Sequence, residues 1–290
     1  MRCKMLSVIV GNSACVAACP YCVSGEVPNA KNTQTPTVNW RNFRIACKAA
    51  DRYGVDTVML TSRGEPTLFP QQITDYLEHL HPFPFPFIEL QTNGIPLARN
   101  PKKYTPFLKK WYELGLTVIT LSVVSHLPSK NQPIYAPHGQ YIDLPALIRF
   151  LHSFGFTLRL TCVLCKGITY TPAQVWEFIQ FAKQNQVEQV TLRPVNDEFR
   201  RPSAKQWIIK HRLSPRDKQA ITRMLEKEGH RVLELGRIGT VYDVEEQNVC
   251  FSVPLNKYTI ETDPNQIRQL IFFQDGHLRY EWEMPGGNLL

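Results

Sequence analysis

The sequence predicts an α/β fold built on a parallel sheet, followed by a smaller α+β appendage. Short β-rich runs alternate repeatedly with helix-length segments, several of those segments end at a glycine, and the alternation stops after Pro194. Repeated strand–helix alternation is typical of parallel strands joined by right-handed crossovers. Such a sheet is either doubly wound or closes toward a barrel.

The individual elements follow from apolar periodicity. The predicted strands are residues 6–10, 57–61, 87–92, 117–122, 158–164 and 189–194. The predicted helices are amphipathic and cover residues 39–53, 71–80, 102–114, 144–154 and 171–184. Gly54, Gly115 and Gly155 follow three of these helices, where a left-handed cap leads into the next strand.

After Pro194 the pattern changes. A charged segment spans residues 197–212, a helix-like stretch spans 214–228, and β-type runs follow without intervening helices. Residues 269–282 predict a hairpin that turns at Asp275-Gly276. We therefore predict a core domain at residues 1–195 and an α+β extension at residues 196–290.

Composition narrows the class of protein. Charged residues make up 20% of the chain, which argues against disorder. The net charge of +8 suits a polyanionic partner, although many soluble proteins are equally basic. The apolar run at residues 6–10 is too short for a signal-peptide core or a membrane span, so we expect a cytoplasmic protein with no membrane partner.

Three cysteines follow the first predicted strand at the spacing C-x3-C-x2-C, namely Cys15, Cys19 and Cys22. Without a secretion signal, cysteines are expected as reduced thiols or metal ligands. Thiolates favour zinc or iron–sulfur clusters. A structural zinc site needs a fourth ligand at short range, and none is near. An iron–sulfur cubane held by three cysteines would leave its fourth iron open.

Two further loops are predicted beside these cysteines. Residues 62–66 (Ser-Arg-Gly-Glu-Pro) follow the second strand, and Asn93 follows the third. The carboxyl ends of parallel strands share one edge of the sheet, so the three loops should meet. Cys162 and Cys165 are three apart on a strand and point to opposite faces, which favours core thiols over ligands of a second cluster. The same interpretation applies to Cys250.

Cys15, Cys19 and Cys22, with the aromatic Tyr21 before the last cysteine, resemble the signature of radical S-adenosylmethionine (SAM) enzymes. The resemblance covers residues 5–195. It implies a partial (β/α)6 barrel of the radical SAM type, with the C-terminal α+β appendage outside it. It also implies a [4Fe-4S] cluster on the three cysteines, SAM bound at the fourth iron, and reductive cleavage of SAM to methionine and a 5'-deoxyadenosyl radical.

Residues 63–66 (Arg-Gly-Glu-Pro) look like the glycine-glycine-glutamate-proline motif of the same family. The resemblance makes Gly64, Glu65 and Pro66 a grip on the methionine amine of SAM. Arg63 departs from the motif at its first position and is either a specificity element or an exposed loop residue. The cofactor contacts that the resemblance implies are Tyr21, Gly64, Glu65, Pro66, Asn93, Ser122 and Arg193.

The last three of these contacts have plain alternatives. Ser122 matches the residue that many members aim at the ribose hydroxyls, and Asn93 matches a segment under SAM or its substrate. Arg193 could pair with a carboxylate through its bidentate fork. Each is equally well explained as a turn or capping residue. His126 and His138 are acid–base candidates in residues 125–141, which we predict as a lid or substrate loop without secondary structure.

The resemblance predicts hydrogen-atom abstraction from a substrate that it does not identify, with electrons from an external donor such as a flavodoxin or ferredoxin. The basic charge ranks a nucleotide or nucleic acid ahead of a peptide. Two alternatives stay open. One is a peptide-modifying or glycyl-radical activating enzyme, and the other is a non-catalytic iron–sulfur or zinc scaffold.

Overall fold

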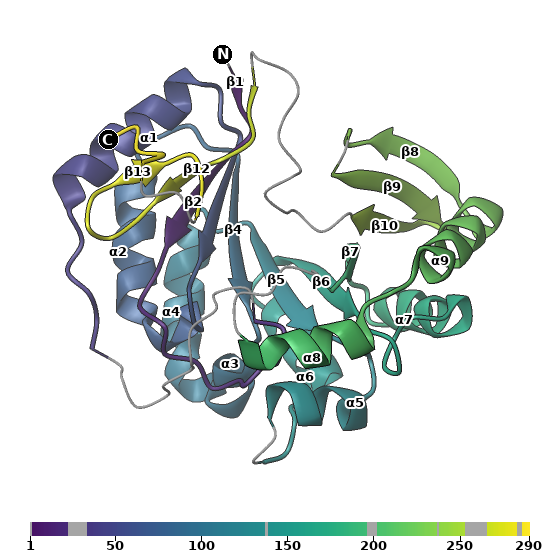
Figure 1. The fold of residues 1–290 in the computed structure, drawn as a ribbon. Coiled ribbons are helices and arrows are strands. Elements are labelled where there is room, and N and C mark those ends of the chain that lie inside the picture. Colours follow the sequence, from purple (N-terminus) through teal and green to yellow (C-terminus); the bar gives the residue numbers. More distant parts are fainter. Residues whose placement is uncertain are drawn as a thin grey trace.

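The computed structural model describes residues 2–22, 34–136, 139–195, 202–236, 238–252, 266–282 and 286–290. These residues form a sheet in the order β13-β12-β2-β3-β4-β5-β6-β7-β10-β9-β8 (Figure 1). Neighbours are parallel from β12 through β10. Because β13 and β8 lie at opposite ends of this order, the sheet is open. The predicted α/β fold with a parallel sheet is confirmed.

The predicted core strands match the observed ones within one residue at every boundary. They are β2 (Met5–Ile9), β3 (Thr57–Thr61), β4 (Phe87–Thr92), β5 (Val118–Val123), β6 (Thr157–Leu164) and β7 (Gln189–Pro194). The helices between them are α1 (Trp40–Arg52), α2 (Pro70–Leu80), α4 (Pro101–Glu113), α6 (Leu144–His152) and α7 (Pro172–Gln184). Gly54, Gly115 and Gly155 all have positive φ, as expected of left-handed caps.

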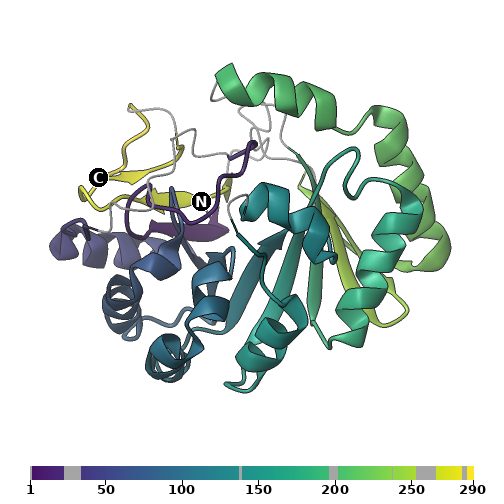
Figure 2. The ribbon, with the colours of Figure 1, turned by 90° about the horizontal axis from the view of Figure 1, so that it is seen from below.

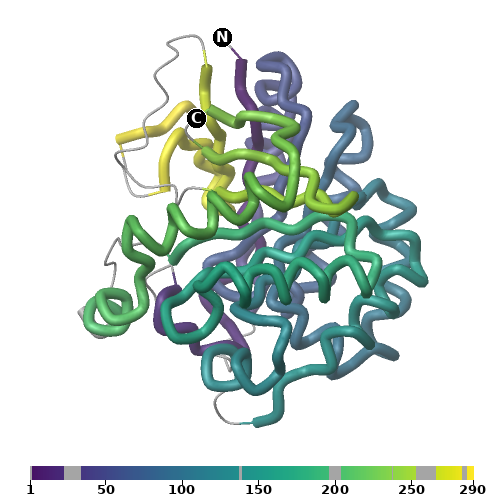
Figure 3. Tube along the Cα trace, turned by 90° about the vertical axis from the view of Figure 1, so that its right-hand side faces the viewer, coloured from purple at the N-terminus to yellow at the C-terminus, as the bar shows by residue number. Residues whose placement is uncertain are grey.

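Segments far along the chain extend both edges of this core. The C-terminal part contains α8 (Pro202–His211), α9 (Pro215–Glu228), β8 (His230–Glu234), β9 (Gly239–Val244), β10 (Gln247–Ser252), β12 (Leu270–Phe272) and β13 (Leu278–Arg279). β10 adds to β7, and β12 adds beside β2, as the yellow and purple tubes of Figure 3 show. The short strands β1 (Arg2–Cys3) and β11 (Gln266–Ile267) pair separately. The domain boundary at residue 195 stays a prediction.

The predicted C-terminal hairpin is present. β12 and β13 are antiparallel, and Gly276 at the turn has a φ of 93°.

One prediction about the segment after β5 was wrong. Residues 125–141 are not a loop without secondary structure, because α5 (Pro128–Tyr135) lies within them. The buried Asn131 side chain bonds the backbone of Val124, Ser125 and Leu127, which satisfies polar groups that periodicity does not reveal.

Helices cover one side of the curved sheet. Figure 2 shows the blue and teal helices along that side, while α8 crosses the other. The two short elements η1 (Pro66–Leu68) and α3 (Ile95–Arg99) follow β3 and β4. No helix in the described ranges is long and apolar enough to cross a membrane.

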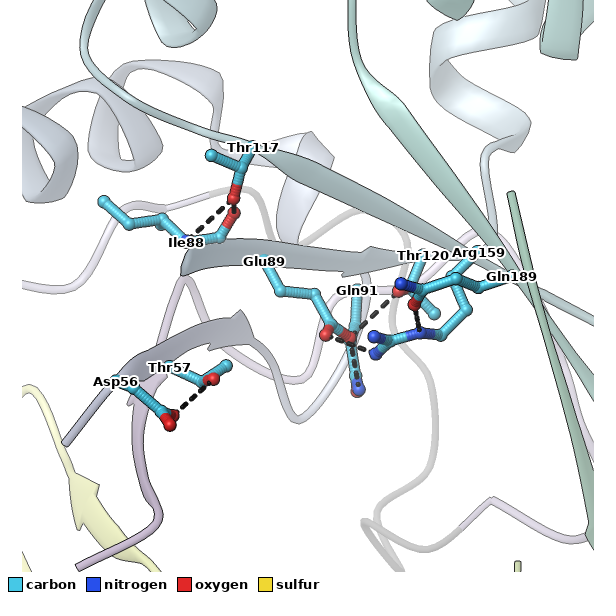
Figure 4. A network of polar contacts seen from close by, with 9 residues as sticks. All are labelled: Asp56, Thr57, Ile88, Glu89, Gln91, Thr117, Thr120, Arg159 and Gln189. Carbon is cyan, nitrogen blue, oxygen red and sulfur yellow. Dashed lines mark hydrogen bonds and ion pairs between the residues drawn. The ribbon is translucent and has the colours of Figure 1, made fainter. Parts of the chain in front are cut away.

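The two faces of the sheet differ in polarity, because side chains alternate along each strand. Ile88 and Leu90 of β4 are buried in the apolar core that the strands share with the helices. Glu89, between them, points to the other face and contacts Arg159 of β6 and Thr120 of β5 (Figure 4). The inner face of the open sheet is therefore polar, whereas the helix-covered face holds the core.

Replacing Leu90 by Ala should lower the free energy of unfolding by about 2–5 kcal/mol, since Leu90 is fully buried. Phe87 is 53% exposed on the same strand, and Phe87→Ala should cost less than about 1 kcal/mol. Urea unfolding followed by circular dichroism measures both changes. Equal losses for the two variants would contradict the placement of the core.

Candidate functional site

The cysteine loop, residues 11–22, begins directly after β2. Ala14 N donates to Asn12 Oδ1 at 2.7 Å, and Cys22 N donates to Cys19 O at 3.2 Å. Cys15, Cys19 and Cys22 are half-buried, and none of the three forms a disulfide. These local bonds fold the loop over the carboxyl end of the sheet, where the sequence placed it.

Gly64 holds the loop after β3 against the cysteine loop. A Cβ at Gly64 would lie 2.1 Å from Ala14 O, so only glycine allows this approach. The next residue completes the contact, because Glu65 N donates to Ala14 O at 2.8 Å. Ser62 Oγ donates to Asn12 O at 3.1 Å and accepts from Gly64 N at 2.9 Å. The two loops thus share one backbone junction.

The Glu65 carboxylate points inward from this junction. It is 1% exposed. Oε1 accepts from Thr67 N at 3.0 Å, from Thr67 Oγ1 at 2.6 Å and from Thr92 Oγ1 at 2.5 Å. Oε2 accepts from Asn93 N at 2.9 Å. Burial raises the pKa of Glu65, although these donors oppose the shift. Glu65 joins the ends of β3 and β4, and neighbouring Pro66 is buried at the start of η1.

Asn93 brings the third strand end to the cysteines. Its Nδ2 donates to Cys15 Sγ at 3.8 Å, and its Oδ1 accepts from Ile95 N at 3.0 Å. The second bond caps the short helix α3. The loops after β2, β3 and β4 therefore meet at one edge, as the sequence predicted.

Tyr21 lies on the far side of the cysteine loop. Its hydroxyl is 2.7 Å from that of Tyr135 on α5, and its ring is 5.4 Å from the ring of Trp207 on α8. Burial raises the pKa of Tyr21 well above its ordinary value. Trp207 in turn stacks on His211 at 4.2 Å. Sequence reasoning missed Tyr135 and Trp207, because both belong to helices in segments that show little amphipathic periodicity.

Ser122 and Arg193 lie farther along the sheet. Ser122 is half-buried on β5, on the same face as Thr120. Arg193 is exposed at the end of β7, and its Nε donates to Ser252 Oγ of β10 at 3.3 Å. In the sheet order, β3 to β6 separate β7 from β2. The structure places Arg193 on a different part of the sheet from the cysteine loop.

The sequence also singled out Arg63, two further cysteines and two histidines. Arg63 is exposed, and its guanidinium lies 5.8 Å from the ring centre of Phe273. Cys162 and Cys165 are fully buried, and burial raises the pKa of Cys165 to about 12. His126 packs on Phe181 of α7, with ring centres 5.6 Å apart. His138 lies outside the described residues.

The three cysteines form a donor set suited to iron. Burial and the nearby Glu65 carboxylate raise the pKa of Cys15 to about 12, so its thiolate needs a compensating positive charge that iron would supply. Among the described side chains, no group of three His, Cys, Asp or Glu is arranged to hold a metal ion. A cluster in which each thiolate binds a different iron fits this donor set in number and chemistry.

No protein-family model and no curated protein matches the sequence. Solved structures do match it. SuiB from Streptococcus suis, bound to the precursor peptide SuiA, has a TM-score of 0.63 at 15% identity over 97% of this chain and 60% of SuiB. anSMEcpe with bound AdoMet has a TM-score of 0.61 at 11% identity over 99% of this chain and 77% of its own. Coproporphyrinogen III oxidase (HemN) from Escherichia coli, a radical SAM enzyme, has a TM-score of 0.52 at 12% identity over 84% and 65%.

These similarities establish the fold. The chain has the open, mostly parallel α/β barrel of radical SAM enzymes, so the fold that the cysteine motif implied is confirmed. SuiB has also been solved with S-adenosylmethionine bound. The chain spans 60–62% of the length of the SuiB chains. At identities of 11–15%, the likeness carries the fold and no particular activity.

Replacing Gly64 by Ala should displace the cysteine loop, because the new Cβ would meet the carbonyl of Ala14. We expect a loss of about 1–3 kcal/mol in the free energy of unfolding and faster alkylation of Cys15. Gly286→Ala is the control, since no atom lies within 4 Å of a Cβ there. Thermal melting and mass spectrometry of iodoacetamide adducts measure these effects. Unchanged stability and Cys15 reactivity would show that the two loops are not packed together.

His126 should make the protein less stable in mild acid. Burial lowers the pKa of His126, and its Nδ1 is buried without a hydrogen-bond partner among the described residues. As the pH falls through about 6.5, the unfolded chain gains a proton that folded His126 does not take up, so the free energy of unfolding falls. His126→Gln should flatten this part of the pH dependence, whereas His81→Gln, at an exposed site, serves as the control. Parallel slopes for wild type and His126→Gln would contradict the burial.

Proposed function

We propose that this protein is a radical SAM enzyme. The observation that carries the proposal is the junction of three strand ends, at which Gly64 and Glu65 lie on the backbone of Ala14 and Asn93 bonds Cys15. Three thiols and the backbone of Gly64 meet at the carboxyl edge of a fold shared with radical SAM enzymes. The residues proposed to hold the cluster and those proposed to hold S-adenosylmethionine are thus adjacent in space.

Each side chain has a proposed role. Cys15, Cys19 and Cys22 hold a [4Fe-4S] cluster, and the backbone around Gly64, Glu65 and Pro66 binds the amine of S-adenosylmethionine. The buried Glu65 carboxylate is locked by Thr67, Thr92 and Asn93, so it fixes the position of that backbone. Asn93 and Tyr21 line the two sides of the cysteine loop. Ser122 and Arg193 supply polar contacts farther along the inner face.

When bound, the cluster and S-adenosylmethionine supply the 5'-deoxyadenosyl radical that abstracts a hydrogen atom from the substrate. The chain's own residues orient the cofactor and exclude water from the carboxyl edge of the sheet. The cluster needs an electron from an external donor, for which we propose a cytoplasmic flavodoxin or ferredoxin. Free thiols at all eight cysteines suit a reducing compartment.

The structure supports a docking place for that donor. α8 lies against the cysteine loop through Trp207 and Tyr21. The segment from α8 to the start of α9 exposes Lys205, Lys210, Arg212, Arg216 and Lys218. Its acidic residue, Asp217, caps α9 by bonding Ser214. A basic surface of this kind attracts an acidic electron carrier.

Two substrate classes remain candidates. The net charge of +8 supports an anionic substrate such as a nucleotide or nucleic acid. A peptide substrate is favoured by a different observation, since both SuiB and anSMEcpe have been solved with peptides bound. Substrates of both classes are polar, which would suit the polar inner face of the sheet.

Anaerobic reconstitution with iron and sulfide tests the proposal. We expect a brown protein that binds about four irons and cleaves S-adenosylmethionine to 5'-deoxyadenosine under dithionite. Cys19→Ala should lose both the cluster absorbance and the cleavage, because two thiolates cannot hold the site-differentiated cluster. Cys47→Ala is the matched control, since Cys47 is buried in α1 away from the cysteine loop.

A colourless protein that holds one zinc ion and leaves S-adenosylmethionine intact would overturn the proposal in favour of a zinc scaffold. A brown protein that never cleaves S-adenosylmethionine would instead indicate an iron–sulfur scaffold.

A further inference from the structure

Arg193 projects onto the polar inner face of the open sheet. Alternation along β7 puts it on the same face as Gln189, four residues earlier. Gln189 accepts a hydrogen bond from Arg159 Nε at 2.8 Å, and Arg159 in turn bonds Glu89 (Figure 4). Arg193 therefore belongs to the part of the inner face that β4, β5, β6, β7 and β10 form, away from the cysteine loop.

The carboxylate on this part of the inner face already has partners. Glu89 is 3% exposed, and its Oε2 lies 2.6 Å from Arg159 Nη1. Its Oε1 accepts from Thr120 Oγ1 at 2.9 Å and from Gln91 Nε2 at 3.2 Å. Glu89 thus neutralises Arg159, and both of its oxygens are engaged.

Arg193 has no carboxylate at ion-pair distance within the described ranges. Its hydrogen bond there runs from Nε to Ser252 Oγ at 3.3 Å, and the side chain is exposed. Arg159 and Arg268 add positive charge around it, whereas Glu89 and the Cys250 thiol favour its charged form. The surrounding protein desolvates Arg193 and lowers the pKa of its guanidinium, although the side chain still reaches solvent. A partly desolvated cation that the described residues do not neutralise costs free energy, which a bound anion would offset.

We propose that Arg193 and Ser252 form an oxyanion subsite that binds a carboxylate or phosphate group of the substrate. The inference rests on the proposed function, because it seats the substrate on the inner face beyond the cysteine loop. The guanidinium fork pairs with an oxyanion through two hydrogen bonds, and the Ser252 hydroxyl, which accepts from Arg193 Nε and donates to Leu192 O, orients that fork. The Arg159–Glu89 ion pair lies beside the subsite on the same face of the sheet.

The position of Arg193 assigns it to the substrate and not to S-adenosylmethionine. Gly64 and Asn93 follow β3 and β4, next to the strand that bears the cysteine loop, whereas Arg193 ends β7. Its neighbours are β6 and β10, and β10 belongs to the C-terminal part of the chain. This part supplies Ser252, so the subsite is completed only by the C-terminal residues.

Binding of small oxyanions to the reconstituted protein tests the subsite. The probes are adenosine monophosphate for a phosphate and N-acetylglutamate for a carboxylate, each followed by ligand-detected NMR. Arg193→Met should weaken binding of the preferred probe about tenfold or more, because it removes charge-assisted hydrogen bonds. Arg193→Lys should fall between wild type and Arg193→Met, since it keeps the charge and loses the fork. Arg44→Met, at an exposed position of α1, is the control and should bind as wild type does.

The outcomes separate the two proposals. Binding of one probe over the other identifies the substrate's anionic group. Equal binding by wild type and Arg193→Met, or no binding of either probe to wild type, would overturn the subsite. Loss of S-adenosylmethionine affinity in Arg193→Met, with probe binding unchanged, would assign Arg193 to the cofactor and also overturn it. Failure of wild-type protein to cleave S-adenosylmethionine while it binds a probe through Arg193 would instead overturn the proposed function.

Discussion

The candidate site depends on one backbone contact, between Gly64 and Glu65 on one loop and Ala14 on the other. It fixes the loop after β3 against the cysteine loop at a distance that no residue with a Cβ could reach. The Glu65 carboxylate extends the contact to β4 through Thr92 and Asn93, and Asn93 returns to Cys15. A closed circuit of hydrogen bonds therefore holds three strand ends in register. Burial makes the circuit rigid, because a polar group released from it would lose its partner away from water.

The second constraint is the difference between the two faces of the sheet. The strands bury Ile88, Leu90 and similar residues under the helices, and this burial stabilises the fold. The inner face carries Glu89, Arg159 and Arg193 at the alternate positions. Charges on a concave face are stable only when they are paired or hydrated. Glu89 and Arg159 satisfy this condition with each other, whereas Arg193 bonds the neutral Ser252 hydroxyl through its Nε. This difference supports the proposed oxyanion subsite on the inner face.

The C-terminal part of the chain completes the sheet at both ends. β10 lies beside β7 and brings Ser252 to Arg193, while β12 lies beside β2 and brings Phe273 under Arg63. α8 crosses the open side and packs Trp207 on Tyr21. The same extension therefore touches the cysteine loop, the loop after β3 and the proposed oxyanion subsite. Its contribution to the site follows from strand pairing, which joins residues that are some 60 to 260 positions apart in the chain.

Sequence alone determined the order and type of the core elements and the cysteine motif. These depend on local properties, such as the apolar runs of β3 and β4, the glycine caps at Gly54, Gly115 and Gly155, and the fixed spacing of Cys15, Cys19 and Cys22. Single charges within apolar strands, at Glu89 and Arg159, were a readable sign of a polar face that sequence reasoning missed. The tertiary structure decided the contacts between segments that are far apart in the chain, which local sequence patterns do not predict. It folded α5 around Asn131, turned Glu65 inward, and put Trp207 on Tyr21 and Ser252 beside Arg193. Such contacts join distant segments, so they are set by packing and by the satisfaction of buried polar groups, not by periodicity.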